Sequence, residues 1–263
     1  MPTICAVEWP DGLLPESDMW RRIRDEVDGI RPDIIVTNEM PFGAWLPKQA
    51  DFDGDAARQW VNLHERALDA LRDLAPAAVI SSRPVLAGDR LANEAFALEG
   101  GRYEILHHKQ LFPAEEGWEE EAWFAPAISG FATKKIGGVE TGILLCTELM
   151  FNEKARHLGR SGAQLIAVPR AAGMNRFSWQ TAGSMAAIVS GAYVVSSNRV
   201  GNAAGGPPMF GGGGFTIDPS GKVIGSTASD RPIITIEVDL AGVDTAKHEY
   251  PVYVDERHIR EER

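Results

Sequence analysis

The feature that most constrains the fold is a regular alternation of short apolar runs with longer amphipathic stretches. Four of the runs are rich in apolar and β-branched residues, as is typical of buried strands: residues 34–37, 78–81, 164–168 and 193–196. Apolar residues at helical spacing lie between them, as in the stretch that Ser17 can cap, which carries Trp20, Ile23, Val27 and Ile30. Strands that alternate with helices favour a layered α/β fold over a sandwich made of strands alone.

Hairpin-like segments interrupt this alternation. Residues 91–98 and 102–106 flank the turn Glu99-Gly100-Gly101, which predicts two antiparallel strands. Strand–helix units mixed with hairpins predict two mixed β-sheets flanked by helices, a four-layer αββα sandwich. No linker or tandem repeat divides the chain, so we expect residues 1–245 to form a single domain. The polar residues 246–263 are expected to form a tail that can pack at a subunit interface.

Charge and composition exclude several classes of partner. The 263 residues include 26 Lys and Arg against 37 Asp and Glu, which gives a formal net charge of −11. An acidic chain without a basic patch disfavours binding to nucleic acid or to an anionic membrane surface. The two cysteines do not suggest a disulfide framework, and the N-terminus lacks the features of a signal peptide. We therefore expect a cytoplasmic protein in a reducing compartment.

Cys146 is the first candidate for a chemical role. It ends an apolar run and precedes a predicted helix over residues 152–159. A thiol at a bend between strand and helix lies at the edge of a sheet, where backbone N–H groups can lower its pKa or bind an oxyanion. Position alone favours a buried core residue over a reactive thiol, and Cys5, inside the first strand, fits a core residue far better.

Glu39 and Lys109 also follow predicted strands. A carboxylate such as Glu39, at a strand end among apolar and aromatic neighbours, can serve as a general base. Lys109 can stabilise a developing negative charge. The adjacent His107 and His108 would face opposite sides of a strand, so they do not predict a metal site. The glycines of residues 211–214 are not followed by Lys-Ser/Thr, so we expect a flexible hairpin rather than a phosphate loop.

Taken in chain order, Glu39, Lys109 and Cys146 resemble the nitrilase (carbon–nitrogen hydrolase) superfamily, which places a Glu, a Lys and a Cys in that order at strand ends. The likeness extends from Ile4 to about Val238 and rests on residues 142–148 with Glu153 and Arg156, and on residues 162–169, 192–201, 210–212 and 218–221. Two departures concern Asn152, which replaces a common proline and is expected to cap the helix, and the loop after the lysine, which is one residue shorter than in many members.

The resemblance implies roles for particular residues. Glu39 would act as the base and Cys146 as the nucleophile, while the Lys109 ammonium and the backbone N–H of Thr147 would hold the oxyanion. The resemblance implies no cofactor or metal. It also implies a homodimer or a higher even-numbered assembly, which we expect to form through the helices that follow Cys146 and Pro169.

The family often has a second acid before a proline. Glu120, six residues before Pro126, fits that spacing best, with Glu119 and Glu121 as close rivals.

The substrate that the resemblance implies is a small amide or carbamoyl compound, cleaved through a thioester to an acid and ammonia or an amine. A nitrilase acting on a C≡N group would use the same residues, and a non-catalytic binding relative or a redox thiol protein are further alternatives. We expect four residues to line the pocket: Phe42, Trp45, Glu148 and Arg170, the last as a ligand for a substrate carboxylate.

Overall fold

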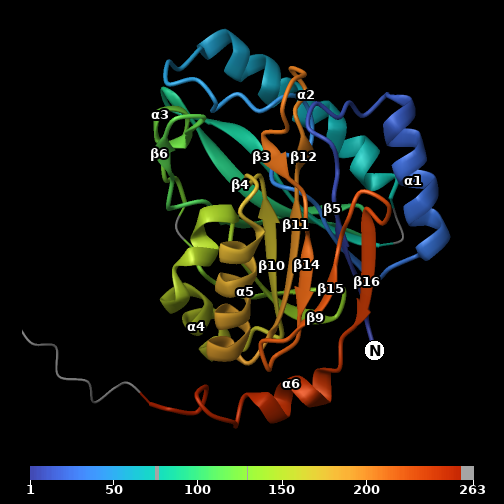
Figure 1. Ribbon diagram of the computed structural model, residues 1–263, viewed down its shortest axis with the longest axis vertical. Coiled ribbons are helices and arrows are strands. Elements are labelled where there is room, and N and C mark those ends of the chain that lie inside the picture. Colours follow the sequence, from blue (N-terminus) through green and yellow to red (C-terminus); the bar gives the residue numbers. More distant parts are fainter. Residues whose placement is uncertain (75–76, 129, 256–263) are drawn as a thin grey trace, which may run out of the picture.

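Two six-stranded sheets form the centre of the molecule, which we describe from a computed structural model for residues 1–74, 77–128 and 130–255 (Figure 1). The first sheet has the strand order β16-β1-β2-β3-β4-β5. Its strands are β1 (Thr3–Val7), β2 (Ile34–Val36), β3 (Ala78–Ala87), β4 (Arg90–Glu99), β5 (Arg102–His108) and β16 (Ile233–Glu237). β1, β2 and β3 run parallel, and the other neighbours pair antiparallel, so the sheet is mixed.

The second sheet has the order β15-β14-β11-β10-β9-β8. Its strands are β8 (Lys134–Ile136), β9 (Val139–Ile143), β10 (Leu165–Arg170), β11 (Tyr193–Asn198), β14 (Phe215–Ile217) and β15 (Val223–Ser226). It too is mixed, since β9, β10 and β11 are parallel and the rest antiparallel. The predicted hairpin of residues 91–106 is confirmed as β4 and β5.

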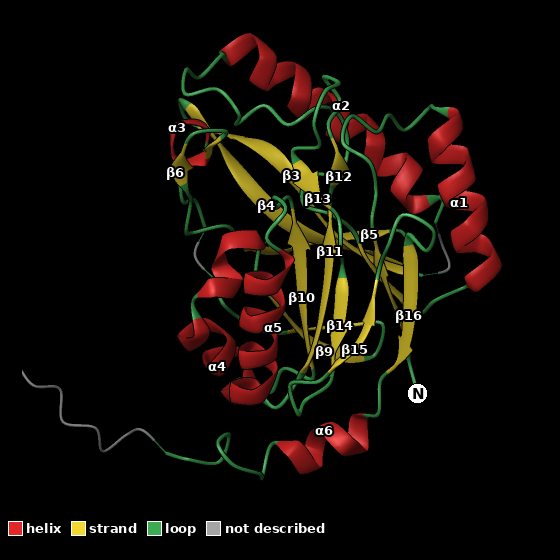
Figure 2. Cartoon of the chain, in the orientation of Figure 1, coloured by secondary structure: helices red, strands yellow, loops and turns green. Residues whose placement is uncertain are grey.

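Helices cover the outer face of each sheet (Figure 2). The long helices are α1 (Asp18–Ile30) and α2 (Gly54–Arg72) on the first sheet, and α4 (Asn152–Arg160) and α5 (Arg176–Ser190) on the second. In β1, Ile4 and Ala6 pack between the sheets, whereas Cys5 and Val7 pack under the helices. This alternation of period two buries both faces of the strand, and the predicted four-layer αββα sandwich is confirmed.

Local signals set several helix ends. Ser17 caps α1, as predicted, by accepting a hydrogen bond from the Trp20 N–H at 3.2 Å. The expectation that Asn152 caps α4 is wrong, because Asn152 is the first helical residue and Phe151 precedes it without a side-chain cap. A 3₁₀ helix, η1 (Cys146–Met150), occupies the bend between β9 and α4. None of the described helices is both long and apolar enough to cross a bilayer.

Short elements complete the chain. They are β6 (Ala114–Glu115), β7 (Trp118–Glu119), α3 (Glu120–Trp123), β12 (Val200–Gly201), β13 (Phe210–Gly211) and α6 (Leu240–Ala246). The expectation of a flexible hairpin at residues 211–214 is wrong, since all four glycines are buried. A Cβ on Gly211 would lie 2.5 Å from the Gly173 carbonyl oxygen, so the lack of a side chain lets these two segments approach closely.

Part of the predicted tail packs on its own chain. Lys247 Nζ donates hydrogen bonds to the carbonyl oxygens of Gly159, Ala163 and Ser190, at or near the ends of α4 and α5. Arg156 of α4 donates to the Val254 carbonyl at 2.8 Å. Residues 256–263 of that tail lie outside the described residues.

Candidate active site

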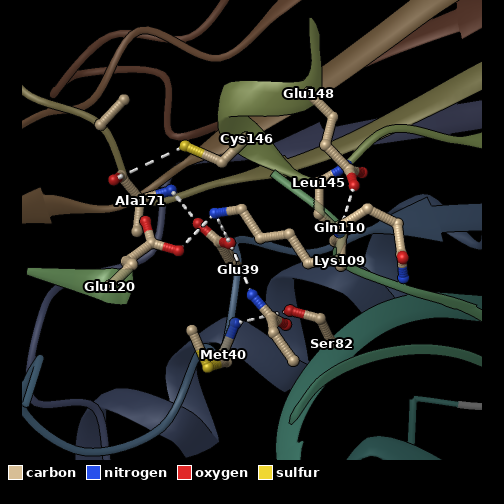
Figure 3. A network of polar contacts seen from close by, with 12 residues as sticks. Glu39, Met40, Ser82, Lys109, Gln110, Glu120, Leu145, Cys146, Glu148 and Ala171 are labelled. Atoms are coloured by element: carbon tan, nitrogen blue, oxygen red, sulfur yellow. Dashed lines mark hydrogen bonds and ion pairs between the residues drawn. The ribbon is translucent and has the colours of Figure 1, made fainter. Parts of the chain in front are cut away.

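The ends of strands from both sheets deliver the candidate catalytic residues to one place (Figure 3). Glu39 lies three residues after β2, and Lys109 follows β5 directly, both in the first sheet. Cys146 begins η1 after β9 of the second sheet, and Glu120 is the first residue of α3. The four side chains that were expected to be catalytic therefore meet at the seam between the two sheets. They are Glu39, Lys109, Cys146 and Glu120.

Lys109 is the centre of a buried ion-pair network. Its Nζ lies 2.9 Å from Glu39 Oε1 and 2.5 Å from Glu120 Oε2, and all three side chains are at most 1% exposed. Burial alone would lower the pKa of Lys109, but the carboxylates of Glu120 and Glu39 outweigh burial and raise it. Lys109 therefore stays an ammonium ion at neutral pH. Of the three rival acids, Glu120 is the one in contact with it, whereas Glu121 is exposed.

The Glu39 carboxylate is fixed by three donors. Oε1 accepts from Lys109 and from Asn93 Nδ2 at 2.7 Å, and Oε2 accepts from the Ala171 N–H at 3.1 Å. Asn93 belongs to β4 of the first sheet, and Ala171 directly follows β10 of the second. The orientation of Glu39 thus depends on both sheets being in place.

Cys146 adopts a backbone conformation that side-chain-bearing residues rarely take. Its φ is +47°, in the left-handed region, which turns the chain sharply at the end of the strand. Its Sγ contacts the Ala171 carbonyl oxygen at 3.8 Å and is the only thiol beside the charged cluster, because Cys5 packs under the helices. Burial and the Glu39 carboxylate raise the pKa of the Cys146 thiol, and Lys109 offsets this only in part. The thiol is therefore protonated at rest and needs a base when it attacks.

Glu120 titrates in the physiological range. Burial raises its pKa to about 7, with the Glu39 charge adding to burial and the Lys109 ammonium opposing it. A buried carboxylate that stays close to half ionised near neutral pH is common where protons move.

A cavity of about 220 Å³ opens beside these groups. Its lining includes Glu120, Cys146 and Thr147, the aromatic rings of Trp118 and Trp179, and residues 171–175 after β10. An acidic group, Glu115, also lines it and is exposed. The cavity is large enough for a small molecule of roughly ten heavy atoms, well below the size of a drug-like ligand.

The four residues expected to line the pocket are not among those that line this cavity. Phe42 packs edge-on to Trp20, with ring centroids 5.3 Å apart, in the core under α1. Trp45 lies behind Trp118, at 6.2 Å between centroids. The sequence identified these side chains as large and apolar but could not tell a core residue from a pocket wall.

Arg170 and Glu148 are committed to the protein itself. Arg170 donates to Ser196 Oγ at 2.6 Å and to the Gly213 carbonyl at 3.1 Å, and its guanidinium lies 5.0 Å from the ring centroid of Trp179. It supports the cavity wall from behind, so the expectation that it binds a substrate carboxylate is not met in this geometry. The Glu148 carboxylate contacts His107 and the backbone N–H groups of Gln110 and Leu145.

Two site residues were not expected from the sequence, namely Asn93 and Ala171. Asn93 is fully buried, and two adjacent polar residues, Asn93 and Glu94, between apolar residues of β4 could have drawn notice. Ala171 acts through its backbone, which leaves no signal in the sequence. His107 and His108 do face opposite ways, toward Glu148 and Glu94. Over the described ranges, no three His, Cys, Asp or Glu side chains are grouped as metal ligands would be.

Comparison with known proteins identifies the family. A model of the carbon–nitrogen hydrolase family matches residues 60–248. The chain belongs to the carbon–nitrogen hydrolase family. Among solved structures, the carbon–nitrogen hydrolase of Helicobacter pylori G27 superposes with a TM-score of 0.83 at 18% identity, covering 97% of this chain and 95% of that one. A Nesterenkonia amidase of the nitrilase superfamily gives a TM-score of 0.75 at 20% identity, with 93% of each chain covered.

Curated relatives of this family member include two amidases. The N-carbamoylputrescine amidase of Solanum tuberosum is 24% identical over 167 residues, which cover 58% of this chain and 56% of the relative, so the match spans about half of that relative's length. The 2-oxoglutaramate amidase of Paenarthrobacter nicotinovorans is 25% identical over 255 residues, which cover 91% of this chain and 84% of the relative.

Proposed function

We propose that this member of the carbon–nitrogen hydrolase family is a cysteine-dependent hydrolase that cleaves a small amide or carbamoyl compound. One observation carries the proposal: a buried lysine bridges two glutamates beside a thiol at a sharp strand-to-helix bend, and a cavity opens on them. Burying such charges costs desolvation free energy. Clusters of buried ionisable groups with shifted pKa values are therefore typical of functional sites.

The first half of the reaction forms a thioester. Glu39 accepts the proton of Cys146, since the raised pKa of the thiol leaves little thiolate at rest. The sulfur attacks the carbonyl carbon, and the carbonyl oxygen becomes an oxyanion. An ammonium has three protons, and the two carboxylates take two of those on Lys109, so one remains for the oxyanion. The Thr147 N–H, second in the 3₁₀ helix and so without an acceptor inside it, is the second donor.

The second half returns the enzyme to its resting state. Protonated Glu39 gives its proton to the leaving nitrogen, the C–N bond breaks, and ammonia or an amine departs. Water then loses a proton to Glu39 and attacks the thioester carbon. The C–S bond breaks, the acid is released, and the proton on Glu39 returns to Cys146. Glu120 orients Lys109 throughout.

The names of the relatives support an amide or carbamoyl substrate over a nitrile, since the two curated relatives named above are amidases. A nitrile would use the same Glu39, Lys109 and Cys146. The presence of all three residues, with Glu39 bonded to Lys109 and Cys146 beside this pair, argues against a non-catalytic binding relative. A redox thiol protein would have no need of Glu39 and Lys109, and the partner thiol, Cys5, is fully buried. The proposed location is the cytoplasm.

The expected homodimer contact through α4 and α5 is proposed here for the exposed side chains of α5, and not for the small apolar residues of the two helices. Ala155, Leu158, Ala186 and Ala187 are fully buried against the chain's own second sheet, so their apolar character needs no partner. Phe177 and Met185 of α5, however, are 80% and 43% exposed. Exposed large apolar side chains on the outer helix layer are typical of a twofold contact between subunits.

The function is tested by measuring ammonia release from matched panels of amides, carbamoyl compounds and nitriles. Glu39→Gln removes the base, so slow turnover should let a thioester accumulate on Cys146, detectable by mass spectrometry of the intact protein and its peptides. An adduct on Cys5 or on a serine would contradict the mechanism. Release from nitriles alone would select the nitrilase alternative.

A further inference from the structure

Glu148 is a completely buried carboxylate that is saturated with donors from the protein. Its Oε2 accepts from the Leu145 N–H at 2.8 Å, and its Oε1 accepts from the Gln110 N–H at 2.7 Å. His107 Nε2 lies 3.0 Å and 2.9 Å from the two oxygens. The residue is 0% exposed and lies two positions after Cys146 in η1.

Each of these donors adjoins a candidate catalytic residue. Leu145 directly precedes Cys146, Gln110 directly follows Lys109, and His107 lies two residues before that lysine. Figure 3 shows Glu148 beside both Leu145 and Gln110, with the Lys109 side chain extending to Glu39 and the Cys146 sulfur pointing toward Ala171. Because Lys109 follows β5 of the first sheet and Cys146 follows β9 of the second, one carboxylate joins the two backbone segments across the seam.

The imidazole strengthens this connection. His107 Nδ1 lies 2.9 Å from the Gly130 carbonyl oxygen, while Nε2 faces the Glu148 carboxylate. Both ring nitrogens therefore face oxygen atoms, so the His107 ring joins the Glu148 carboxyl group to the Gly130 carbonyl.

From this geometry we propose that Glu148 is a positioning residue, which holds the Cys146 bend and the Lys109 backbone at the separation that the reaction requires. It does so without touching substrate. The inference rests on the function proposed above. A residue at positive φ, such as Cys146, keeps its conformation only if its surroundings fix it. Glu148 binds the N–H of Leu145, the residue directly before Cys146. Misplacing a reacting group by about 1 Å can cost roughly 100-fold in rate.

An amide cannot replace this carboxylate. The two backbone partners of Glu148 are N–H donors that face different oxygens, so the position needs two acceptor oxygens. Glu148→Gln keeps the shape but supplies one oxygen and one NH₂ group. That NH₂ would face either the Leu145 or the Gln110 N–H, leaving a buried donor unpaired and pushing one segment away. Glu148→Asp keeps both oxygens on a shorter stem, so it should restore part of the connection.

Glu94→Gln is the matched control. Glu94 is also a buried carboxylate, 4% exposed, and it also pairs with a histidine, His108 at 3.0 Å. Its other partners are the side chains of Arg83 and Tyr103, so all three partners are side chains of the first sheet, and Glu94 holds no backbone N–H on either side of the seam. The two Gln variants therefore replace similar buried carboxyl groups, of which only Glu148 joins the backbone of the two sheets.

The experiment compares the three variants with wild-type protein, all assayed well below their unfolding temperatures. It measures kcat and KM on the best amide of the panel, and the rate at which iodoacetamide alkylates Cys146. We expect Glu148→Gln to lower kcat by roughly 100-fold with KM within about threefold, to slow alkylation of Cys146, and to be partly rescued in Glu148→Asp. We expect Glu94→Gln to keep kcat within about threefold at a similar loss of thermal stability.

Two results would overturn the inference: a Glu148→Gln protein with kcat within threefold of wild type, or a Glu94→Gln protein that loses as much kcat as Glu148→Gln. Should the Gln variant fail to fold, Glu148→Asp decides by the same comparison with Glu94→Gln. Wild-type protein with neither turnover nor preferential alkylation of Cys146 over Cys5 overturns both this inference and the proposed function. A normal wild type beside an active Glu148→Gln variant overturns the inference alone.

Discussion

The two cysteines offer a controlled test of the nucleophile, because they are alike in burial and different in surroundings. Cys5 is 0% exposed and Cys146 3% exposed. Replacing either by alanine removes one buried sulfur atom. The cost should be similar for both, about 1–2 kcal/mol of unfolding free energy. The left-handed φ of Cys146 adds nothing to the cost, since cysteine and alanine both carry a Cβ.

The chemical consequences should differ sharply. Cys146→Ala removes the covalent route, so we expect turnover to fall by at least about 10⁴-fold, which corresponds to about 5 kcal/mol in the activation barrier. Cys5→Ala should keep wild-type turnover within about twofold, because that thiol packs under α1 and α2, where burial raises its pKa to about 12. The activity loss in one variant thus exceeds any effect of shared destabilisation.

The assay pairs ammonia release with thermal unfolding of both variants. Iodoacetamide labelling followed by peptide mass spectrometry adds a readout that needs no substrate, and the label should be on Cys146 in wild type and in Cys5→Ala. The assignment of the nucleophile would be refuted if pure Cys146→Ala protein kept more than about 1% of wild-type turnover. Equal loss in both variants would show that stability, and not chemistry, limits activity.

Further measurements test the charges, the packing and the assembly. Glu120 has a pKa of about 7 and holds Lys109 best when ionised, so kcat/KM should rise as the pH increases through 7. Glu120→Gln should have a lower kcat/KM without this rise. A variant that keeps the same pH dependence would contradict the role of Glu120. Gly159→Ala would place a Cβ 2.5 Å from the Ser190 backbone between α4 and α5, so it should lower the unfolding free energy by about 2–3 kcal/mol, measured by chemical denaturation. Gly29→Ala, whose Cβ would have no atom within 4 Å, should leave the unfolding free energy unchanged or raise it. Light scattering should give about twice the 28.6 kDa of one chain, and Phe177→Asp should halve that mass; a monomeric wild type would remove the argument for a dimer.

Features that arise from local sequence could be predicted. The buried strands, the helix that Ser17 caps and the turn at Gly100-Gly101 each depend on neighbouring residues, and the structure confirms them. The grouping of Glu39, Lys109 and Cys146 was predicted through the resemblance to the nitrilase superfamily, since position alone did not favour a chemical role for Cys146 or Glu39.

Features that depend on contacts between distant residues could not be predicted. Glu148 is separated by about forty residues from Gln110 and His107, so nothing near it in the sequence shows that its carboxylate is already occupied. Trp45 packs behind Trp118, which lines the cavity, so Trp45 does not reach the cavity itself. This depends on a contact between residues that lie far apart in the sequence. The buried glycines at residues 211–214 appeared flexible in sequence because their neighbours, such as the Gly173 carbonyl, come from elsewhere in the chain.

The pairing of β1 with β16 has a consequence for how the chain is made. Thr3 lies opposite Glu237 and Val7 opposite Ile233, so one edge of β1 is covered by a strand that follows it by more than 220 residues. At ordinary translation rates, roughly 10 to 50 seconds separate the appearance of the two strands at the ribosome. During that time an apolar strand with unpaired N–H and C=O groups is available to other nascent chains, which makes this edge the place where a chaperone would be needed most.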